Sequence, residues 1–282
     1  MSQIADLVPT VERELLVEAG RPSRLGERLR RYGPPALVFL LALAAWEAIV
    51  TIFHIEGFLL PKPSVIASTF AREFVVVWPA GLFTLREAVG GFLLGSLLGV
   101  GISLVTGRWT TVGQAVTPFA IAVNSTPIVA LAPIMNNWFG ITNPLSKMSI
   151  VAVIVFFPVM INTLRGLTQV SAGAVELMRS YAAGDLAVLI KLRIPNALPF
   201  TFSAFKVGST LSVIGAIVSE YFGGSREALG VYISQQAALF HFAEAWAAII
   251  VACLMGIGFY LAILLAERLV MPWHVSLRDE AT

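Results

Sequence analysis

The chain has 282 residues, of which 57% are apolar and only 13% are charged, and its mean hydropathy is +0.82. Soluble domains carry about twice that charged fraction, so the composition excludes an ordinary soluble protein, whose surface needs more polar residues. The net charge of +2 says little as a total, and the single cysteine, Cys253, excludes a disulfide framework within the chain.

The N-terminal 31 residues are polar and rich in arginine, and the apolar sequence starts only after them. This order does not match a cleavable signal peptide, so 1–31 is predicted as a tail. Six later segments each hold about 20 mostly apolar residues, the length that crosses a bilayer as a helix. They cover residues 35–53, 83–106, 112–135, 145–164, 199–221 and 243–266. We therefore predict an all-α membrane domain over 32–274 and a short tail over 275–282.

The distribution of basic residues predicts the orientation of these spans. One side of the membrane receives Arg13, Arg21, Arg24, Arg28, Arg30, Arg31, Arg108, Arg165, Arg179, Lys191, Arg193, Arg268 and Arg278. The other side receives far fewer. Because cytoplasmic loops carry the excess of lysine and arginine, both termini are predicted to be cytoplasmic.

The third predicted span, 112–135, is the most polar of the six. Asn124, Ser125 and Thr126 lie in its middle, directly before Pro127. Polar residues at membrane depth usually face a bundle interior or a path. We therefore expect these three side chains to line a solute path.

Two ionisable residues of the fifth predicted span are further path candidates. Lys206 lies inside the span near its start, and Glu220 lies near its outer end. Each has a simpler alternative: Lys206 extends its amino group to the cytoplasmic interface, and Glu220 caps or pairs locally.

The second span carries Gly91, Gly95 and Gly99 at intervals of four, which predicts a face for close helix packing. No GxxxxGK[ST] phosphate loop and no HExxH zinc motif occurs in the sequence. We expect no catalytic residue, no metal site, no cofactor and no nucleic-acid partner.

The loop between the fourth and fifth spans, about 165–198, contains a helical pattern of its own. Apolar or small residues recur at intervals of three and four, at Val175, Met178, Ala182, Leu186 and Leu189. An amphipathic helix that Pro195 ends is therefore predicted. The pattern alone leaves two alternatives open: the helix lies on the lipid surface, or it docks onto another protein.

This loop resembles the EAA coupling motif of the permease subunits of bacterial ABC importers. Glu176 matches the glutamate of the motif, and Arg193-Ile194-Pro195 matches its end. Leu177 and Met178 replace the two alanines, and Ala182 stands at the usual glycine position.

Further segments in the same order strengthen the resemblance, which covers about 58–274. They are Leu60 to Ser64, Thr84 to Phe92, Asn124 to Gly140, Phe156 to Thr163 and Ser219-Glu220. The subgroup that the chain resembles transports nitrate, sulfonates and taurine. The runs Leu177 to Ala183 and Glu220 to Gly224 look most like its thiamine-pyrimidine precursor and riboflavin branch.

The resemblance implies a type I importer permease of the inner membrane, with six transmembrane helices and a cytoplasmic coupling helix. It implies three kinds of partner: a second permease copy that completes a homodimer, two ATP-binding cassette ATPase subunits, and an extracytoplasmic substrate-binding protein. The residues expected to form the coupling surface are Glu176, Met178, Arg179, Tyr181, Ala182 and Ala183. The rival functions are a channel or secondary transporter not coupled to ATP, and a membrane-embedded enzyme.

Overall fold

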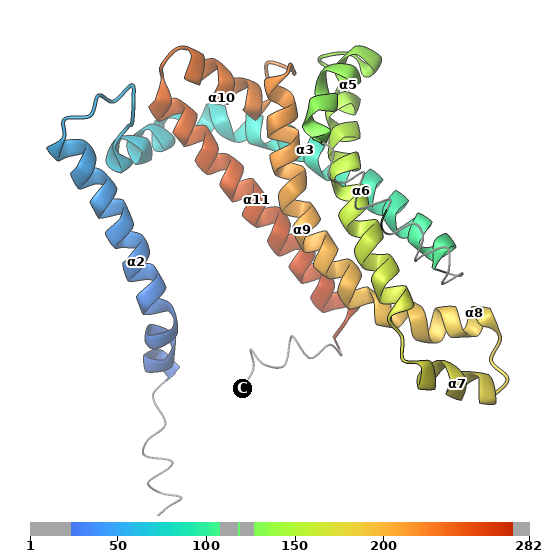
Figure 1. The fold of residues 1–282 in the computed structure, drawn as a ribbon. Helices are drawn as coiled ribbons and strands as arrows, with labels where there is room; N and C mark the ends of the chain where they lie inside the picture. The colour runs from blue at the N-terminus through green and yellow to red at the C-terminus, as the bar shows by residue number, and fades with distance from the viewer. Residues whose placement is uncertain (1–23, 108–117, 119–126, 273–282) are drawn as a thin grey trace, which may run out of the picture. The chain divides into compact units, whose positions relative to one another are not determined.

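The computed structural model describes residues 24–107, 118 and 127–272, and every regular element within these residues is helical (Figure 1). The elements before the loop of the EAA motif are α2 (Arg24–Ile52), α3 (Pro63–Thr106), the 3-10 turn η1 (Ile128–Leu131), α5 (Ala132–Phe139) and α6 (Pro144–Thr168). They are followed by α7 (Ala172–Ser180), α8 (Asp185–Val188), the π-helical segment η2 (Leu189–Arg193), α9 (Ile194–Tyr221), α10 (Leu229–Ala238) and α11 (Phe242–Val270).

Five helical stretches of the described chain are long and apolar enough to cross a membrane. They are Gly33–Ile52, Pro63–Thr106, Pro144–Thr168, Asp185–Tyr221 and Phe242–Val270. The first, second, fourth, fifth and sixth predicted spans are thereby confirmed as helices. Most of the third, 112–135, lies outside the described residues, and its described end forms η1 and the short α5. The count of six spans stays a prediction.

The chain divides into two compact units, 1–64 and 65–282. In the first unit α2 begins at Arg24, inside the stretch predicted as a tail. Glu47 of α2 binds the start of α3, because its carboxylate accepts from Ser64 N at 3.1 Å and from Ser64 Oγ at 2.8 Å. The first N–H groups of a helix have no partner within the helix, so this side chain serves as a cap from another helix.

The helix α3 is much longer than the predicted second span, 83–106. It runs without interruption for 44 residues and includes Pro79. At 1.5 Å per residue this is about 66 Å, against about 30 Å for a hydrocarbon core. Only part of α3 can therefore lie within the membrane core, and its first turns extend beyond the predicted span.

In the second unit, α3, α6 and α9 share one apolar core. Its buried members are Ala88 and Phe92 of α3, Val151, Val155 and Val159 of α6, and Ala204, Val213 and Ala216 of α9. The helices α6, α9 and α11 run side by side (Figure 1). A second core joins Val77 of α3 to α10 and α11 through Leu229, Ile233, Ala245, Ala248, Val251 and Met255.

Glycines of α3 form the close contact with α6, as the sequence predicts. A Cβ on Gly91 would lie 2.5 Å from Val151 Cβ and 2.6 Å from the carbonyl oxygen of Met148. A Cβ on Gly99 would lie 2.9 Å from the carbonyl oxygen of Phe156. The backbones therefore approach each other at distances that a side chain would prevent.

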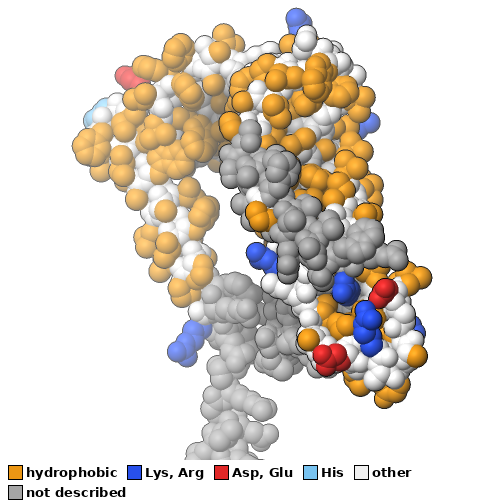
Figure 2. Space-filling model, turned by 45° about the vertical axis from the view of Figure 1, so that its right-hand side comes forward, with side chains coloured by type: hydrophobic (Ala, Val, Ile, Leu, Met, Phe, Trp, Pro, Cys, Tyr) orange, Lys and Arg blue, Asp and Glu red, His pale blue; other side chains and the backbone are white. Residues whose placement is uncertain are grey.

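The long helices expose many large apolar side chains, among them Leu97 at 71% and Leu265 at 59%. Figure 2 shows apolar side chains over the long helices, whereas charged ones gather at the end that carries α7 and α8. Such surfaces belong against lipid or another helix.

Replacing Gly91 by alanine tests the close approach of α3 and α6. We expect Gly91→Ala to lower the free energy of unfolding by about 1–3 kcal/mol, because the added methyl group overpacks a tight contact. Thermal unfolding in detergent measures the loss. The matched control is Gly101→Ala, since a Cβ at Gly101 has no neighbour within 4 Å. Equal melting temperatures for the two variants would contradict the packing.

Candidate functional site

The helix α7 carries the first half of the predicted coupling surface and is almost free of tertiary packing. It begins at an N-cap, Ser171, whose Oγ accepts a hydrogen bond from Ala174 N at 3.3 Å. None of its residues is buried. Glu176 and Arg179 are exposed and Met178 is half-buried. Local capping, rather than a core, therefore stabilises this helix.

A Schellman turn ends α7 where the family motif places its glycine. Ala183 N donates to Met178 O at 3.1 Å, and Ala182 N donates to Arg179 O at 2.9 Å. These are the two hydrogen bonds that define the motif, and its C′ residue adopts the left-handed conformation. Ala182 occupies that position with a φ of 56°. Glycine takes this conformation without steric cost, which explains why the motif has glycine there.

The predicted single helix up to Pro195 is wrong, and this turn is the reason. The helix ends at Ser180, and a new one begins at Asp185. The reversal at Ala182 interrupts the apolar stripe that joined Val175 to Leu189. An ion pair of 3.1 Å between Arg179 and Asp185 crosses the turn. Both side chains are exposed, so the pair adds little stability.

The second half of the segment leads directly into a membrane helix. Asp185–Tyr221 is one continuous helical stretch made of α8, η2 and α9. Pro195 does not stop it but lies in the first turn of α9. In the preceding η2 the hydrogen bonds widen to i→i+5, as Ile194 N to Leu189 O shows. A widened turn next to proline is a common way for a helix to continue past a residue that lacks an N–H.

At the opposite end of the bundle, Glu220 caps α10. Its Oε2 accepts from Gly230 N at 2.6 Å, and its Oε1 accepts from Thr84 Oγ1 at 2.8 Å. The same hydroxyl accepts from Leu229 N at 2.9 Å. Two first-turn N–H groups of α10 are thus satisfied by side chains of α9 and α3. This geometry favours the local capping alternative for Glu220.

Sequence reasoning missed the polar cluster beside Glu220. Lys147, of which 1% is exposed, donates to Asn136 Oδ1 at 2.9 Å and to the carbonyl oxygen of Ile141. Asn136 Nδ2 donates in turn to Phe222 O at 3.1 Å, which ties α5 to the end of α9. Glu87 of α3 is also buried and lies within electrostatic reach of Lys147 and Glu220. The sequence signal that could have revealed this cluster is Glu87, an acidic residue inside the second predicted span.

Lys206, the other ionisable path candidate, is paired rather than free. Its Nζ lies 2.9 Å from Glu267 Oε2 and 3.1 Å from Glu267 Oε1, so the ion pair links α9 to α11. Glu267 was not predicted as its partner. The remaining path candidates, Asn124, Ser125 and Thr126, lie outside the described residues.

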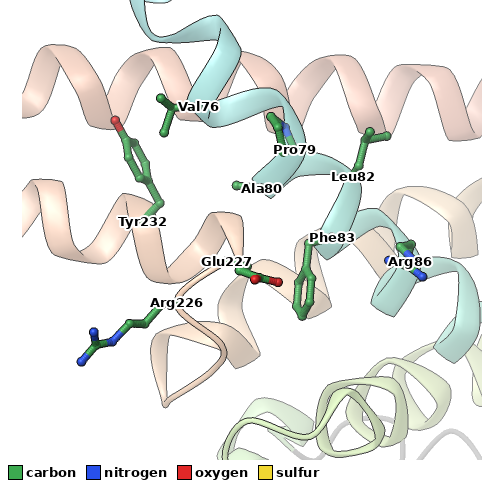
Figure 3. A pocket seen from close by; sticks show the side chains of 9 residues that line it. All are labelled: Val76, Pro79, Ala80, Leu82, Phe83, Arg86, Arg226, Glu227 and Tyr232. Atoms are coloured by element: carbon green, nitrogen blue, oxygen red, sulfur yellow. The ribbon is translucent and has the colours of Figure 1, made fainter.

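A pocket of about 490 Å³ opens between α3, the 225–228 loop and α10 (Figure 3). Its apolar wall includes Val76, Pro79, Ala80, Leu82 and Phe83, and its other lining residues are Arg86, Arg226, Glu227 and Tyr232. The Arg226 guanidinium points away from the Glu227 carboxylate (Figure 3). In a preformed anion site the charged groups would converge on one point. The side chains of Arg226 and Glu227 do not (Figure 3).

Tyr232, on the wall of this pocket, belongs to α10, which is not among the candidate spans. Burial, followed by the negative charges of Glu73 and Glu244, raises the pKa of its hydroxyl above the usual value. The phenol is neutral at physiological pH even without this shift and can donate a hydrogen bond.

These elements define a helical protein with several helices long and apolar enough to cross a membrane, in which Glu220, Thr84 and Asn136 bind backbone groups at helix ends. A family model described as "Binding-protein-dependent transport system inner membrane component" matches residues 91–273. The chain belongs to this family. It is a multi-pass inner-membrane permease component of an ABC transporter, and it is a transport protein and not an enzyme.

Individual relatives have similar lengths and transport different solutes according to their names. The chain is 32% identical over 254 residues to the riboflavin transport system permease protein RibX of Chloroflexus aurantiacus, covering 88% of this chain and 94% of that protein. It is 30% identical over 241 residues to the formylaminopyrimidine transport permease protein ThiX of Halalkalibacterium halodurans, covering 85% and 95%. It is 27% identical over 254 residues to the putative aliphatic sulfonates transport permease protein SsuC of Bacillus subtilis, covering 88% and 90%.

Substituting glycine for Ala182 tests the turn. We expect Ala182→Gly to stabilise the α7–α8 turn by about 1 kcal/mol, because it removes the left-handed penalty of a Cβ. Ala182→Val should weaken it, since a β-branched residue fits that conformation poorly. Hydrogen exchange of peptides from 172–190 measures both effects. Faster exchange in the glycine variant than in the valine variant would contradict the assignment.

Removing one hydroxyl tests the capping of α10. Thr84→Val keeps the side-chain shape but leaves Leu229 N without its acceptor, so we expect a loss of about 1–3 kcal/mol. Thr84→Ser retains the hydroxyl and serves as the control. Thermal unfolding in detergent compares the two, and a valine variant as stable as the serine variant would refute the cap.

Proposed function

We propose that this chain forms half of the solute path of an ATP-driven importer. A second copy of the chain completes a homodimer, two ATPase subunits bind on the cytoplasmic side, and a separate binding protein delivers the solute from outside. In this orientation both termini are cytoplasmic, and the α7–α8 segment faces the ATPase. The tails are 1–31 and 275–282, and 32–274 is the permease domain.

The observation that carries the proposal is the exposed but well-capped α7–α8 segment. Leu177 is 59% exposed, Tyr181 80% and Leu186 68%, although all three are large and apolar. A helix with so little packing of its own, held in shape by a cap and a Schellman turn, is preorganised for a partner. We assign the coupling surface to Glu176, Met178, Arg179, Tyr181, Ala182 and Ala183.

The two ends of the bundle differ in a way that suits this orientation. Charged residues surround α7 and α8, whereas α5 and α10 cover the other end, where the polar cluster of Lys147 and Glu220 holds them. The proposed delivery of solute occurs at that second end. Asn124, Ser125 and Thr126 remain the proposed lining of the path, with Lys206 and Glu220 as further candidates.

We propose a small organic solute of the riboflavin or thiamine-pyrimidine precursor class. The resemblance of the segments 177–183 and 220–224 to that branch supports the proposal, and so do the names of RibX and ThiX. Sulfonate, taurine and nitrate are the other solute classes named among the relatives.

Co-purification and ATP hydrolysis test the coupling surface. The chain is co-expressed with an ATPase subunit and a binding protein of an importer from the same organism, and the complex is reconstituted. We expect the binding protein to stimulate hydrolysis in the wild type. Glu176→Lys and Ala182→Asp should lose assembly or stimulation, because each places a new charge on the docking surface.

Glu227→Lys is the control for assembly. Like Glu176→Lys it replaces an exposed glutamate by lysine, but at the end of the bundle opposite α7 and α8. If no ATPase co-purifies even with the wild type, the proposal fails. The helix α7 would then lie on lipid, and a channel or secondary transporter would replace the importer. A working complex permits uptake measurements with riboflavin, formylaminopyrimidine and taurine.

A further inference from the structure

The junction between the α7–α8 segment and α9 is bonded to the end of α3. Arg193 Nη1 donates to the carbonyl oxygen of Gly107 at 2.7 Å. Gly107 directly follows Thr106, the last residue of α3. The last carbonyls of a helix lack partners within it and carry partial negative charge, so a guanidinium binds well there. This bond is charge-assisted and half-buried, and it spans 86 residues of sequence.

A second side chain, three residues further on, binds the end of α6. Asn196 Nδ2 donates to Gly166 O at 2.7 Å and to Gln169 O at 3.3 Å. Gln169 is the C-cap of α6. Close packing accompanies these bonds, because a Cβ on Gly166 would lie 2.6 Å from Ala197 Cα. One turn at the junction thus holds the C-terminal ends of two other helices.

These hydrogen bonds lie where the α7–α8 segment, residues 172–188, joins the membrane helix α9. The α7–α8 segment continues into α9 without a loop, and Arg193 is the last residue of the π-helical η2. A force on α8 therefore reaches α9 through the helix itself. Arg193 and Asn196 contact the ends of α3 and α6 within the same turn.

We propose that Arg193 and Asn196 are positioning residues that transmit movement of the α7–α8 segment to α3 and α6. The inference rests on the proposed function, in which an ATPase moves that segment. In each protomer α3, α6 and α9 then respond as one body, which their shared apolar core also favours. The alternative is that the two side chains only stabilise helix ends.

The test compares Arg193→Met and Asn196→Leu with Lys191→Met in the full reconstituted complex. Lys191 is an exposed neighbour on the same segment, so Lys191→Met removes the same charge with the same replacement side chain. Four quantities are measured: co-purification of the ATPase, basal hydrolysis, the stimulation of hydrolysis by the binding protein, and the melting temperature of the complex.

We expect Arg193→Met and Asn196→Leu to retain the ATPase and basal hydrolysis, while stimulation by the binding protein falls about fivefold or more, as for the loss of an allosteric coupling. Lys191→Met should match the wild type. Asn196→Leu is independent of the charge and decides the question if Arg193→Met does not assemble.

Two results would overturn the inference. Stimulation unchanged in both variants, with only a lower melting temperature, would make the side chains simple helix caps. An equal loss of stimulation in Lys191→Met would mean that the removed positive charge causes the effect, and not the hydrogen bond from Arg193 to Gly107. Failure of the wild type to bind any ATPase is a different outcome, since it rejects the proposed function itself.

Discussion

The satisfaction of backbone groups at helix ends is the constraint on which this structure depends. Hydrocarbon offers no hydrogen bonds to free N–H and C=O groups, so a membrane protein must supply partners from its own chain. Here other helices supply them: Glu47 binds the start of α3, and Glu220 with Thr84 binds the start of α10. Arg193 and Asn196 do the same for the final carbonyls of α3 and α6. In the described part of the chain, these polar side chains thus lie where helix ends require hydrogen-bond partners.

These end contacts also explain how so apolar a core specifies one arrangement. The cores around Phe92 and Val251 consist of aliphatic and aromatic residues without directional bonds. Apolar packing alone tolerates rearrangement, whereas a buried hydrogen bond has a defined length and direction. Lys147 and Asn136 fix α5 against α6 and α9, and the pair of Lys206 and Glu267 fixes α9 against α11. Between these points the close approach at Gly91 and Gly99 sets the spacing of α3 and α6.

Sequence reasoning predicted the features that depend on local composition, namely five described spans and the glycine face of α3, whereas the motif-bearing loop, predicted as 165–198, is shortened by α6 and by the stretch Asp185–Tyr221. It missed features that depend on distant residues or on backbone conformation. The partner of Glu220, Thr84, lies 136 residues away, so no spacing rule reveals it. The extension of α3 back to Pro63 was also missed, since the predicted span began only at residue 83, and the helix continues through Pro79. The break of α7 at Ala182 was missed because an alanine in an amphipathic pattern predicts helix, and only the geometry reveals its left-handed conformation.

The π-helical turn at Leu189–Arg193 has a consequence for how this loop tolerates change in length. A π turn accommodates one residue more than the α-helix around it, and each residue of an α-helix advances the azimuth by about 100°. The side of α8 that faces outward is therefore set by that additional residue as much as by the side chains of α8. A family member with one residue fewer at this point would present a different face of α8, even with an identical sequence in the motif. Two such chains with the same residues in α8 would therefore present different residues of α8 outward.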